Sequence, residues 1–258
     1  MLNTIKVGDP KNPPLIIAHG LFGSAKNWGV MSRRLSDEWY VISVDMRNHG
    51  NSSSHPDHNY EVMADDLEKV IKSFGGYCSI LGHSMGGKAF MYLALQNPKI
   101  VAKLIVVDIA PINYNHSQID IVKALQSIDL KLVNSRRDAD NVLASFIEEK
   151  EVRDFLLQNL KFESHTTWDL NLTSLEKNME KILNFPSSNQ AFNGETLLIV
   201  GENSTYVSPN NILIMRKKFS DLRVKRIGGA GHWVHVEKPI EFEHSVREFL
   251  SFQDYLSQ

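Results

Sequence analysis

The chain has 258 residues, of which 42% are hydrophobic and 22% are charged, and its formal net charge is −2. This length and usage fit one globular domain with a sizeable core and exclude a globally disordered chain. The basic residues occur only in short clusters, so nucleic acid is not expected as a partner.

The single cysteine, Cys78, excludes an intramolecular disulfide. The N-terminus lacks the apolar segment of a secretory signal, and no apolar run is long enough to span a membrane. We therefore expect a cytoplasmic location.

Short apolar runs bounded by turn residues recur along the chain. Each has the length of a strand and is rich in Val, Ile or Leu without polar alternation, which is typical of strands buried on both faces of a parallel sheet. The predicted strands cover residues 15–18, 40–44, 77–81, 104–107, 197–200 and 224–227.

Between these runs, apolar residues recur at helical spacing. The predicted helices cover residues 27–35, 60–74, 85–96, 209–219 and 239–252. Strands and helices that alternate with short connections predict an α/β fold with a mostly parallel, doubly wound sheet.

The alternation stops between residues 112 and 190. This stretch has no convincing strand, and it is too long for a plain loop in a compact domain. Its amphipathic segments predict helices at 119–128, 138–149, 151–160 and 172–183. We therefore predict a core formed by residues 1–111 and 191–258, with residues 112–190 inserted as a helical cap. The cap is expected over the carboxyl edge of the sheet, where ligands bind in open α/β folds.

The segment Gly82-His83-Ser84-Met85-Gly86 follows a predicted strand and opens a predicted helix. It has the G-x-S-x-G pattern of a nucleophile elbow in the context that the elbow requires. Glycines beside Ser84 allow a sharp, strained turn that raises the serine hydroxyl above the edge of the sheet. Ser84 is therefore the predicted nucleophile.

A serine hydroxyl needs a base. His232, in a glycine-rich loop after the last predicted strand, is the predicted base, and His235 is its rival. Two carboxylates could supply the acid that holds the His232 tautomer and stabilises the imidazolium. We favour Asp108, directly after the strand that follows the elbow, over Glu202, the only carboxylate after the penultimate strand.

The spacing of His232, His235 and Glu237 fits no standard zinc motif, so no metal ion is predicted there.

Acyl transfer also needs an oxyanion hole. The backbone N–H of Met85, the residue after the nucleophile, is expected to supply one donor. The second donor is expected from residues 19–24, where we choose Leu21 with Phe22 as the alternative; a structural role is predicted for His19.

The polar segment 45–52 is expected to hydrogen-bond loops together at the sheet edge, with a substrate role for Arg47 or His49 as the alternative. Apolar side chains of the predicted cap are candidates for selecting the acyl chain: Phe146, Phe155, Leu156 and Trp168.

Together these motifs resemble the YbfF-type esterases, small bacterial members of the α/β-hydrolase superfamily. The resemblance rests on residues 19–24, 45–50, 82–88, 107–111 and 229–235, on both sides of the predicted insertion. It implies an esterase with a helical cap and no cofactor that acts on short to medium acyl esters, with acyl-CoA thioesters as a further expectation. In that family the triad acid follows the strand after the elbow, which supports Asp108.

The same triad serves carbon–carbon bond hydrolases and cofactor-free perhydrolases, which remain the alternatives. Haloalkane dehalogenases and epoxide hydrolases need an aspartate nucleophile, which Ser84 excludes. The expected partner is therefore a small-molecule acyl ester or thioester. The sequence does not predict the oligomeric state.

Overall fold

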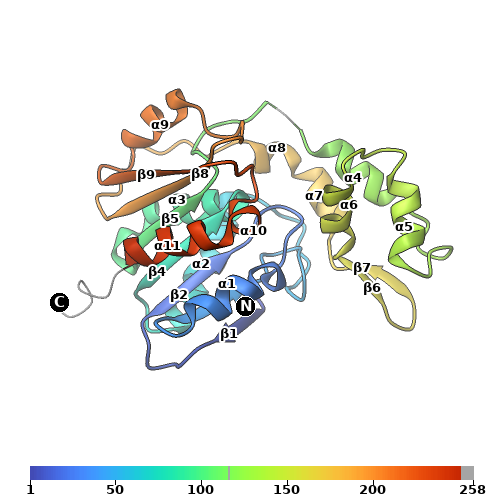
Figure 1. The fold of residues 1–258 in the computed structure, drawn as a ribbon, viewed down its shortest axis with the longest axis horizontal. Coiled ribbons are helices and arrows are strands. Elements are labelled where there is room, and N and C mark those ends of the chain that lie inside the picture. Colours follow the sequence, from blue (N-terminus) through green and yellow to red (C-terminus); the bar gives the residue numbers. More distant parts are fainter. Residues whose placement is uncertain (116, 251–258) are drawn as a thin grey trace.

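A seven-stranded sheet forms the centre of the computed structural model, which describes residues 1–115 and 117–250 (Figure 1). Its strand order is β1-β3-β2-β4-β5-β8-β9, and only β1 runs antiparallel to its neighbour. The strands are β1 (Thr4–Val7), β2 (Pro14–Ala18), β3 (Tyr40–Val44), β4 (Cys78–His83), β5 (Val101–Val107), β8 (Thr196–Gly201) and β9 (Leu222–Ile227).

All six predicted strands are present, and the predicted fold class is confirmed. The strand of this sheet that the sequence did not predict is β1. It lies at the edge of the sheet, where Lys6 is exposed and the other three residues are only half-buried. Such an edge strand lacks the continuous apolar run that reveals strands buried on both faces.

Helices cover both faces of the sheet. They are η1 (Ala25–Trp28), α1 (Gly29–Leu35), α2 (Tyr60–Ser73), α3 (Met85–Gln96), η2 (Pro98–Ile100), α9 (Pro209–Arg216), α10 (Val234–Glu237) and α11 (Pro239–Leu250). Because successive strand residues point to opposite faces, Ile16 and Ile80 pack with α2 and α3, whereas Leu15 and Leu81 pack with α1 and α11. The predicted end of the last helix, at residues 251–252, lies outside the described residues.

Residues 112–115 and 117–190 form a lobe beside the sheet (Figure 1). Its elements are α4 (Ile119–Gln126), α5 (Arg136–Leu143), α6 (Lys150–Leu157), β6 (Leu160–Phe162), β7 (Thr166–Trp168), α7 (Leu172–Lys177) and α8 (Met179–Leu183). The expectation that this stretch has no strand is wrong, because β6 and β7 pair as an antiparallel hairpin. Strands of three residues are too short to show a readable alternation.

The lobe and the sheet share one apolar core, since residues of α4–α8 belong to the same buried cluster as those of β2, β4 and β5. Backbone hydrogen bonds also join the loop after β3 to the chain after β7. The Gly50 N–H donates to the Asp169 carbonyl over 2.8 Å, and the Asn171 N–H donates to the Asn48 carbonyl over 2.9 Å. The lobe is therefore packed against the carboxyl end of the sheet.

Candidate active site

Ser84 lies in the sharp turn between β4 and α3, with φ 50° and ψ −117°. This backbone conformation is strained for a residue with a side chain, and such strain is typical of functional turns. The neighbouring glycines are required because the turn leaves no space. A Cβ on Gly82 would lie 2.5 Å from the backbone of Gly86, and a Cβ on Gly86 would lie 2.5 Å from the Ala18 carbonyl oxygen.

Asp108 and His232, which are far apart in the chain, lie in contact. The distance from His232 Nδ1 to Asp108 Oδ2 is 2.7 Å, and the Asp108 side chain is fully buried. Because an ionised carboxylate only accepts hydrogen bonds, Nδ1 carries the proton and Nε2 is left as the basic nitrogen.

The loop after β8 supplies the other partners of Asp108. The Gly201 N–H donates to Oδ1 over 3.1 Å, and the Ser204 hydroxyl donates to Oδ2. Asp108 itself has φ 51°, an uncommon value for a residue with a side chain. Its carboxylate is therefore held in one orientation from two directions.

The two rival residues are engaged elsewhere. Glu202 is exposed, and its Oε2 accepts the Gly229 N–H over 2.9 Å, so it supports the glycine-rich loop rather than the imidazole. His235 is buried and stacks on Trp28 with ring centroids 4.2 Å apart. Burial, followed by the proximity of His232, lowers the pKa of His235 to about 3. His235 is thus a neutral packing residue.

Ser84 and His232 line the same cavity, together with residues of the lobe. Within the described chain, no hydrogen bond joins the Ser84 hydroxyl to the imidazole. Catalytic hydrogen bonds are often long without substrate and tighten in the reacting complex, so this separation is compatible with proton transfer.

Tyr206 was not singled out from the sequence as a site residue. Its ring stacks on the imidazole of His232, with centroids 3.8 Å apart and an angle of 17° between the planes. Tyr206 belongs to the loop after β8, in which Glu202 is the only carboxylate. The aromatic residue in that loop is the sequence signal that could have identified Tyr206 as a site residue.

The backbone N–H groups proposed for the oxyanion hole lie at the cavity. Met85 begins α3, so its N–H has no acceptor within the helix. The Phe22 N–H donates to His49 Nε2 over 3.2 Å and is therefore already engaged. Among the described residues the Leu21 N–H has no such acceptor, and this geometry favours Leu21 over Phe22.

The loop that carries Leu21 is fixed by His19, as expected from the sequence. His19 Nδ1 donates to the Gly20 carbonyl over 2.7 Å, and its Nε2 accepts the Met46 N–H over 2.9 Å. Arg47 pairs with Asp66 over 2.7 Å, and its guanidinium is not among the groups that line the cavity. The polar segment after β3 therefore holds loops together, which matches the structural role predicted for it.

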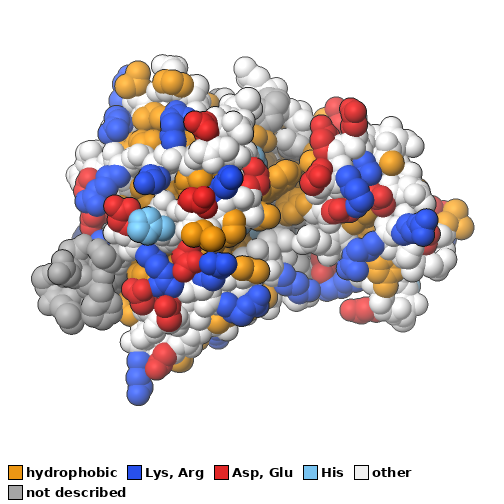
Figure 2. All heavy atoms as spheres, viewed as in Figure 1, with side chains coloured by type: hydrophobic (Ala, Val, Ile, Leu, Met, Phe, Trp, Pro, Cys, Tyr) orange, Lys and Arg blue, Asp and Glu red, His pale blue; other side chains and the backbone are white. Residues whose placement is uncertain are grey.

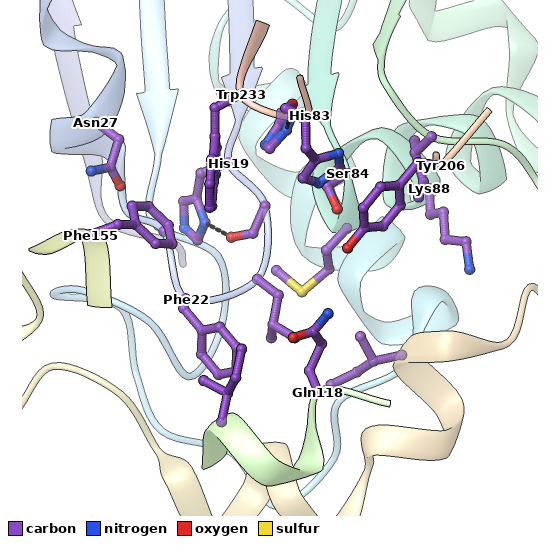
Figure 3. Close-up of a pocket in the computed structure, with 18 of the residues that line it drawn as sticks. His19, Phe22, Asn27, His83, Ser84, Lys88, Gln118, Phe155, Tyr206 and Trp233 are labelled. Carbon is purple, nitrogen blue, oxygen red and sulfur yellow. Dashed lines mark hydrogen bonds between the residues drawn. The ribbon is translucent and has the colours of Figure 1, made fainter. Parts of the chain in front are cut away.

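The cavity has a volume of about 300 Å³ and is lined mainly by apolar side chains. Figure 2 shows hydrophobic side chains in the hollow between the sheet and the lobe. In Figure 3, Phe155 and Gln118 point into this space from the lobe, while Ser84 and Tyr206 face it from the core. Of the candidate acyl-selecting residues, Phe155 and Leu156 line the cavity. Phe146 is exposed, and Trp168 is not among the residues that line the cavity.

Lys88 joins the elbow helix to the lobe. Its Nζ donates to the Leu183 carbonyl over 2.8 Å at the end of α8, and it lies 4.8 Å from the ring centre of Tyr114. Burial lowers the pKa of Lys88 to about 7. The ammonium group therefore satisfies a helix terminus of the lobe from within the core.

Across residues 1–115 and 117–250, no three His, Cys, Asp or Glu side chains are grouped so that they could hold a metal ion. In the same ranges, no helix has both the length and the apolar character needed to cross a membrane.

A family model described as the alpha/beta hydrolase fold matches residues 13–239. The chain is 38% identical over 254 residues to the sn-1-specific diacylglycerol lipase ABHD11 of Mus musculus, covering 95% of this chain and 83% of that protein. It is 35% identical over 242 residues to the esterase YbfF of Escherichia coli K12, covering 93% and 94%. The resemblance to YbfF-type esterases is thereby confirmed.

A solved structure described as a marine microorganism esterase superposes with a TM-score of 0.93 at 37% identity, covering 96% of this chain and 99% of that one. The similarity extends along 96% of the chain and therefore reaches into the insertion as well as the core.

Proposed function

The chain belongs to the α/β-hydrolase fold family, and from this premise we propose that it is a serine carboxylic-ester hydrolase with Ser84, Asp108 and His232 as its triad. Relatives named esterase and lipase support ester hydrolysis as the general reaction. The observation that carries the residue assignment is the 2.7 Å contact between Asp108 and His232 beside the strained turn at Ser84.

In the proposed reaction, His232 Nε2 removes the Ser84 hydroxyl proton while Oγ attacks the acyl carbonyl carbon. The N–H groups of Leu21 and Met85 donate to the oxygen that becomes negatively charged. Asp108 stabilises the imidazolium that forms.

The imidazolium then protonates the leaving alcohol or thiol, which departs and leaves an acyl-enzyme on Ser84. His232 next removes a proton from water, and the resulting hydroxide attacks the acyl carbon. The acid is released as Ser84 Oγ regains its proton. No residue is consumed in this cycle.

We further propose that the lobe of residues 112–190 acts as a cap and that the substrate carries a short to medium acyl chain. A volume of about 300 Å³ is at the lower end for small-molecule sites, and its apolar lining suits an acyl chain. Acyl-CoA thioesters, whose leaving thiol needs less protonation than an alkoxide, belong to the same proposal. We also propose a cytoplasmic location.

The test is hydrolysis of p-nitrophenyl esters from acetyl to dodecanoyl, with the wild type beside Ser84→Ala. We expect the variant to lose about three orders of magnitude or more in kcat. The wild type should have its optimum at a short or medium acyl length. Acyl-CoA of the same lengths, followed by thiol release, tests the thioester part.

A folded wild type that hydrolyses none of these substrates would overturn the proposal. The remaining candidates would then be carbon–carbon bond hydrolysis, tested with a diketone, and perhydrolysis, tested with hydrogen peroxide and a carboxylic acid.

A further inference from the structure

The backbone around Phe22 is held from two sides. Phe22 has φ 62°, a left-handed conformation that is uncommon for a bulky residue and requires surrounding contacts to persist. It directly follows Leu21, which lines the cavity and whose N–H is the proposed oxyanion-hole donor. The contacts that hold Phe22 therefore fix the orientation of the neighbouring peptide group.

The first of these contacts comes from the core. His49 is fully buried, and its Nε2 accepts the Phe22 N–H over 3.2 Å. Its Nδ1 donates to the Arg47 carbonyl over 2.9 Å, which fixes the tautomer with the proton on Nδ1. His49 is thus held as a hydrogen-bond acceptor for the loop.

The second contact comes from the lobe. Asn159, between α6 and β6, is 5% exposed, and its Nδ2 donates to the Phe22 carbonyl over 2.8 Å and to the Leu156 carbonyl over 3.0 Å. Both partners are carbonyls, so only the amide nitrogen can satisfy them and the side-chain orientation is defined. The backbone carbonyl of Asn159 also accepts the Asp169 N–H over 2.8 Å, which ties Asn159 to the chain after β7.

We propose that Asn159 is a positioning residue that fixes the oxyanion loop, residues 19–24, from the lobe, opposite His49 of the core. The inference rests on the proposed ester hydrolysis and goes beyond it. Its consequence is that the oxyanion hole reaches its full geometry only when the lobe is seated against the sheet. The lobe then contributes to the rate of the chemical step as well as to the choice of acyl chain.

Asn178 provides a matched control. It is also 5% exposed, belongs to the same lobe, and donates from Nδ2 to one core carbonyl, that of Pro56 over 2.8 Å, and to one lobe carbonyl, that of Ser174 over 2.9 Å. Asn159→Leu and Asn178→Leu therefore remove the same kind of contact between lobe and core. Only Asn159 contacts the oxyanion loop.

The experiment compares the two variants with the wild type in thermal unfolding, in kcat and KM for a p-nitrophenyl ester, and in inhibition by phenylboronic acid. Bound as a tetrahedral adduct of Ser84, the boronic acid places an oxygen in the oxyanion hole. For Asn159→Leu we expect kcat to fall about 10- to 100-fold while KM changes less than about threefold. Inhibition by the boronic acid should weaken by a similar factor to kcat. Asn178→Leu should lower the unfolding temperature comparably and leave kcat and inhibition near the wild-type values.

Equal losses of kcat in both variants, or an unchanged kcat in Asn159→Leu, would overturn the inference. Should Asn159→Leu not fold, the pair Asn159→Ser and Asn178→Ser removes the same donors without placing an apolar group in a polar site. If the wild type hydrolyses the ester and Ser84→Ala does not, the proposed function stands whatever Asn159 does. A wild type that is inactive on every ester would overturn both proposals.

Discussion

The sheet and the lobe differ in how each contributes to the site. The sheet places Ser84, Asp108 and His232 in turns at the ends of strands, where the register fixes their positions. The lobe supplies apolar walls such as Phe155 and reaches the reacting region through single polar contacts such as Asn159. Under the proposed function, we therefore expect the sheet to set the reaction type and the lobe to set the acyl preference and the final alignment.

The largest expected effect tests the contribution of the sheet. Asp108→Asn keeps the shape of the side chain but removes the charge that holds the His232 tautomer, so kcat should fall about 10³- to 10⁴-fold. Glu202→Gln should stay close to wild type, because Glu202 accepts a backbone N–H of the glycine-rich loop. Ester hydrolysis by both variants, with circular dichroism to verify folding, decides whether Asp108 or Glu202 is the triad acid. The reverse order of activities would make Glu202 the acid.

A smaller effect is expected where core and lobe meet. His49→Gln retains an acceptor near the position of Nε2, whereas His49→Leu leaves the Phe22 N–H without one. We expect about a tenfold or greater loss of kcat in His49→Leu and a partial recovery in His49→Gln. Measuring kcat at saturating ester checks this. Equal activity in the two variants would show that the acceptor is not what matters.

A change confined to the lobe should alter preference more than rate. Phe155 lines the cavity and packs near Trp233, with ring centroids 5.5 Å apart. Phe155→Ala should lengthen the preferred acyl chain and change kcat/KM for the best wild-type substrate by roughly 10-fold. Phe146→Ala is the control, since that side chain is 61% exposed and outside the cavity lining. An unchanged chain-length profile in Phe155→Ala would place the acyl chain elsewhere.

The last prediction concerns pH and stability rather than activity. Because burial lowers the pKa of Lys88 to about 7 in the folded protein, the unfolded state binds the proton more strongly between that pH and the ordinary lysine pKa. Lys88 should therefore make the free energy of unfolding rise as the pH increases from about 7 to about 10. In Lys88→Met this contribution is absent. When the free energy of unfolding is measured with urea at several pH values in that range, its slope against pH should therefore differ between the two proteins. Parallel slopes would mean that the Lys88 pKa is ordinary.

Much of the sheet and its turns could be predicted from local sequence. The strand before Ser84 reads as an apolar run, and the glycines beside the serine are required by contacts of 2.5 Å within one turn. Asp108 and His232 could be proposed as partners because the carboxyl ends of parallel strands meet at one edge. Their catalytic roles stay predictions.

The features that the sequence did not predict depend on contacts between distant segments. Asn159 lies 137 positions from Phe22, and nothing near Asn159 in the sequence indicates a hydrogen bond to that loop. Tyr206 likewise reaches His232 only through the fold. In the lobe, short elements such as β6 and β7 lack a readable period, and the predicted helix 151–160 ends at Leu157 instead. Packing decides these boundaries more than local propensity does.

The strand order has a consequence for synthesis of the chain. β5 pairs on one side with β4, which precedes it, and on the other side with β8, which begins at Thr196. While the ribosome translates residues 108–195, about 4–18 s at roughly 5–20 residues per second, the outer edge of β5 has no partner strand. All but one residue of this strand are buried in the finished fold, so a nascent or truncated chain exposes an apolar edge that can pair with another molecule. Expression fragments that end before β8 should therefore aggregate, whereas fragments that extend through α11, which covers one face of the sheet, should not.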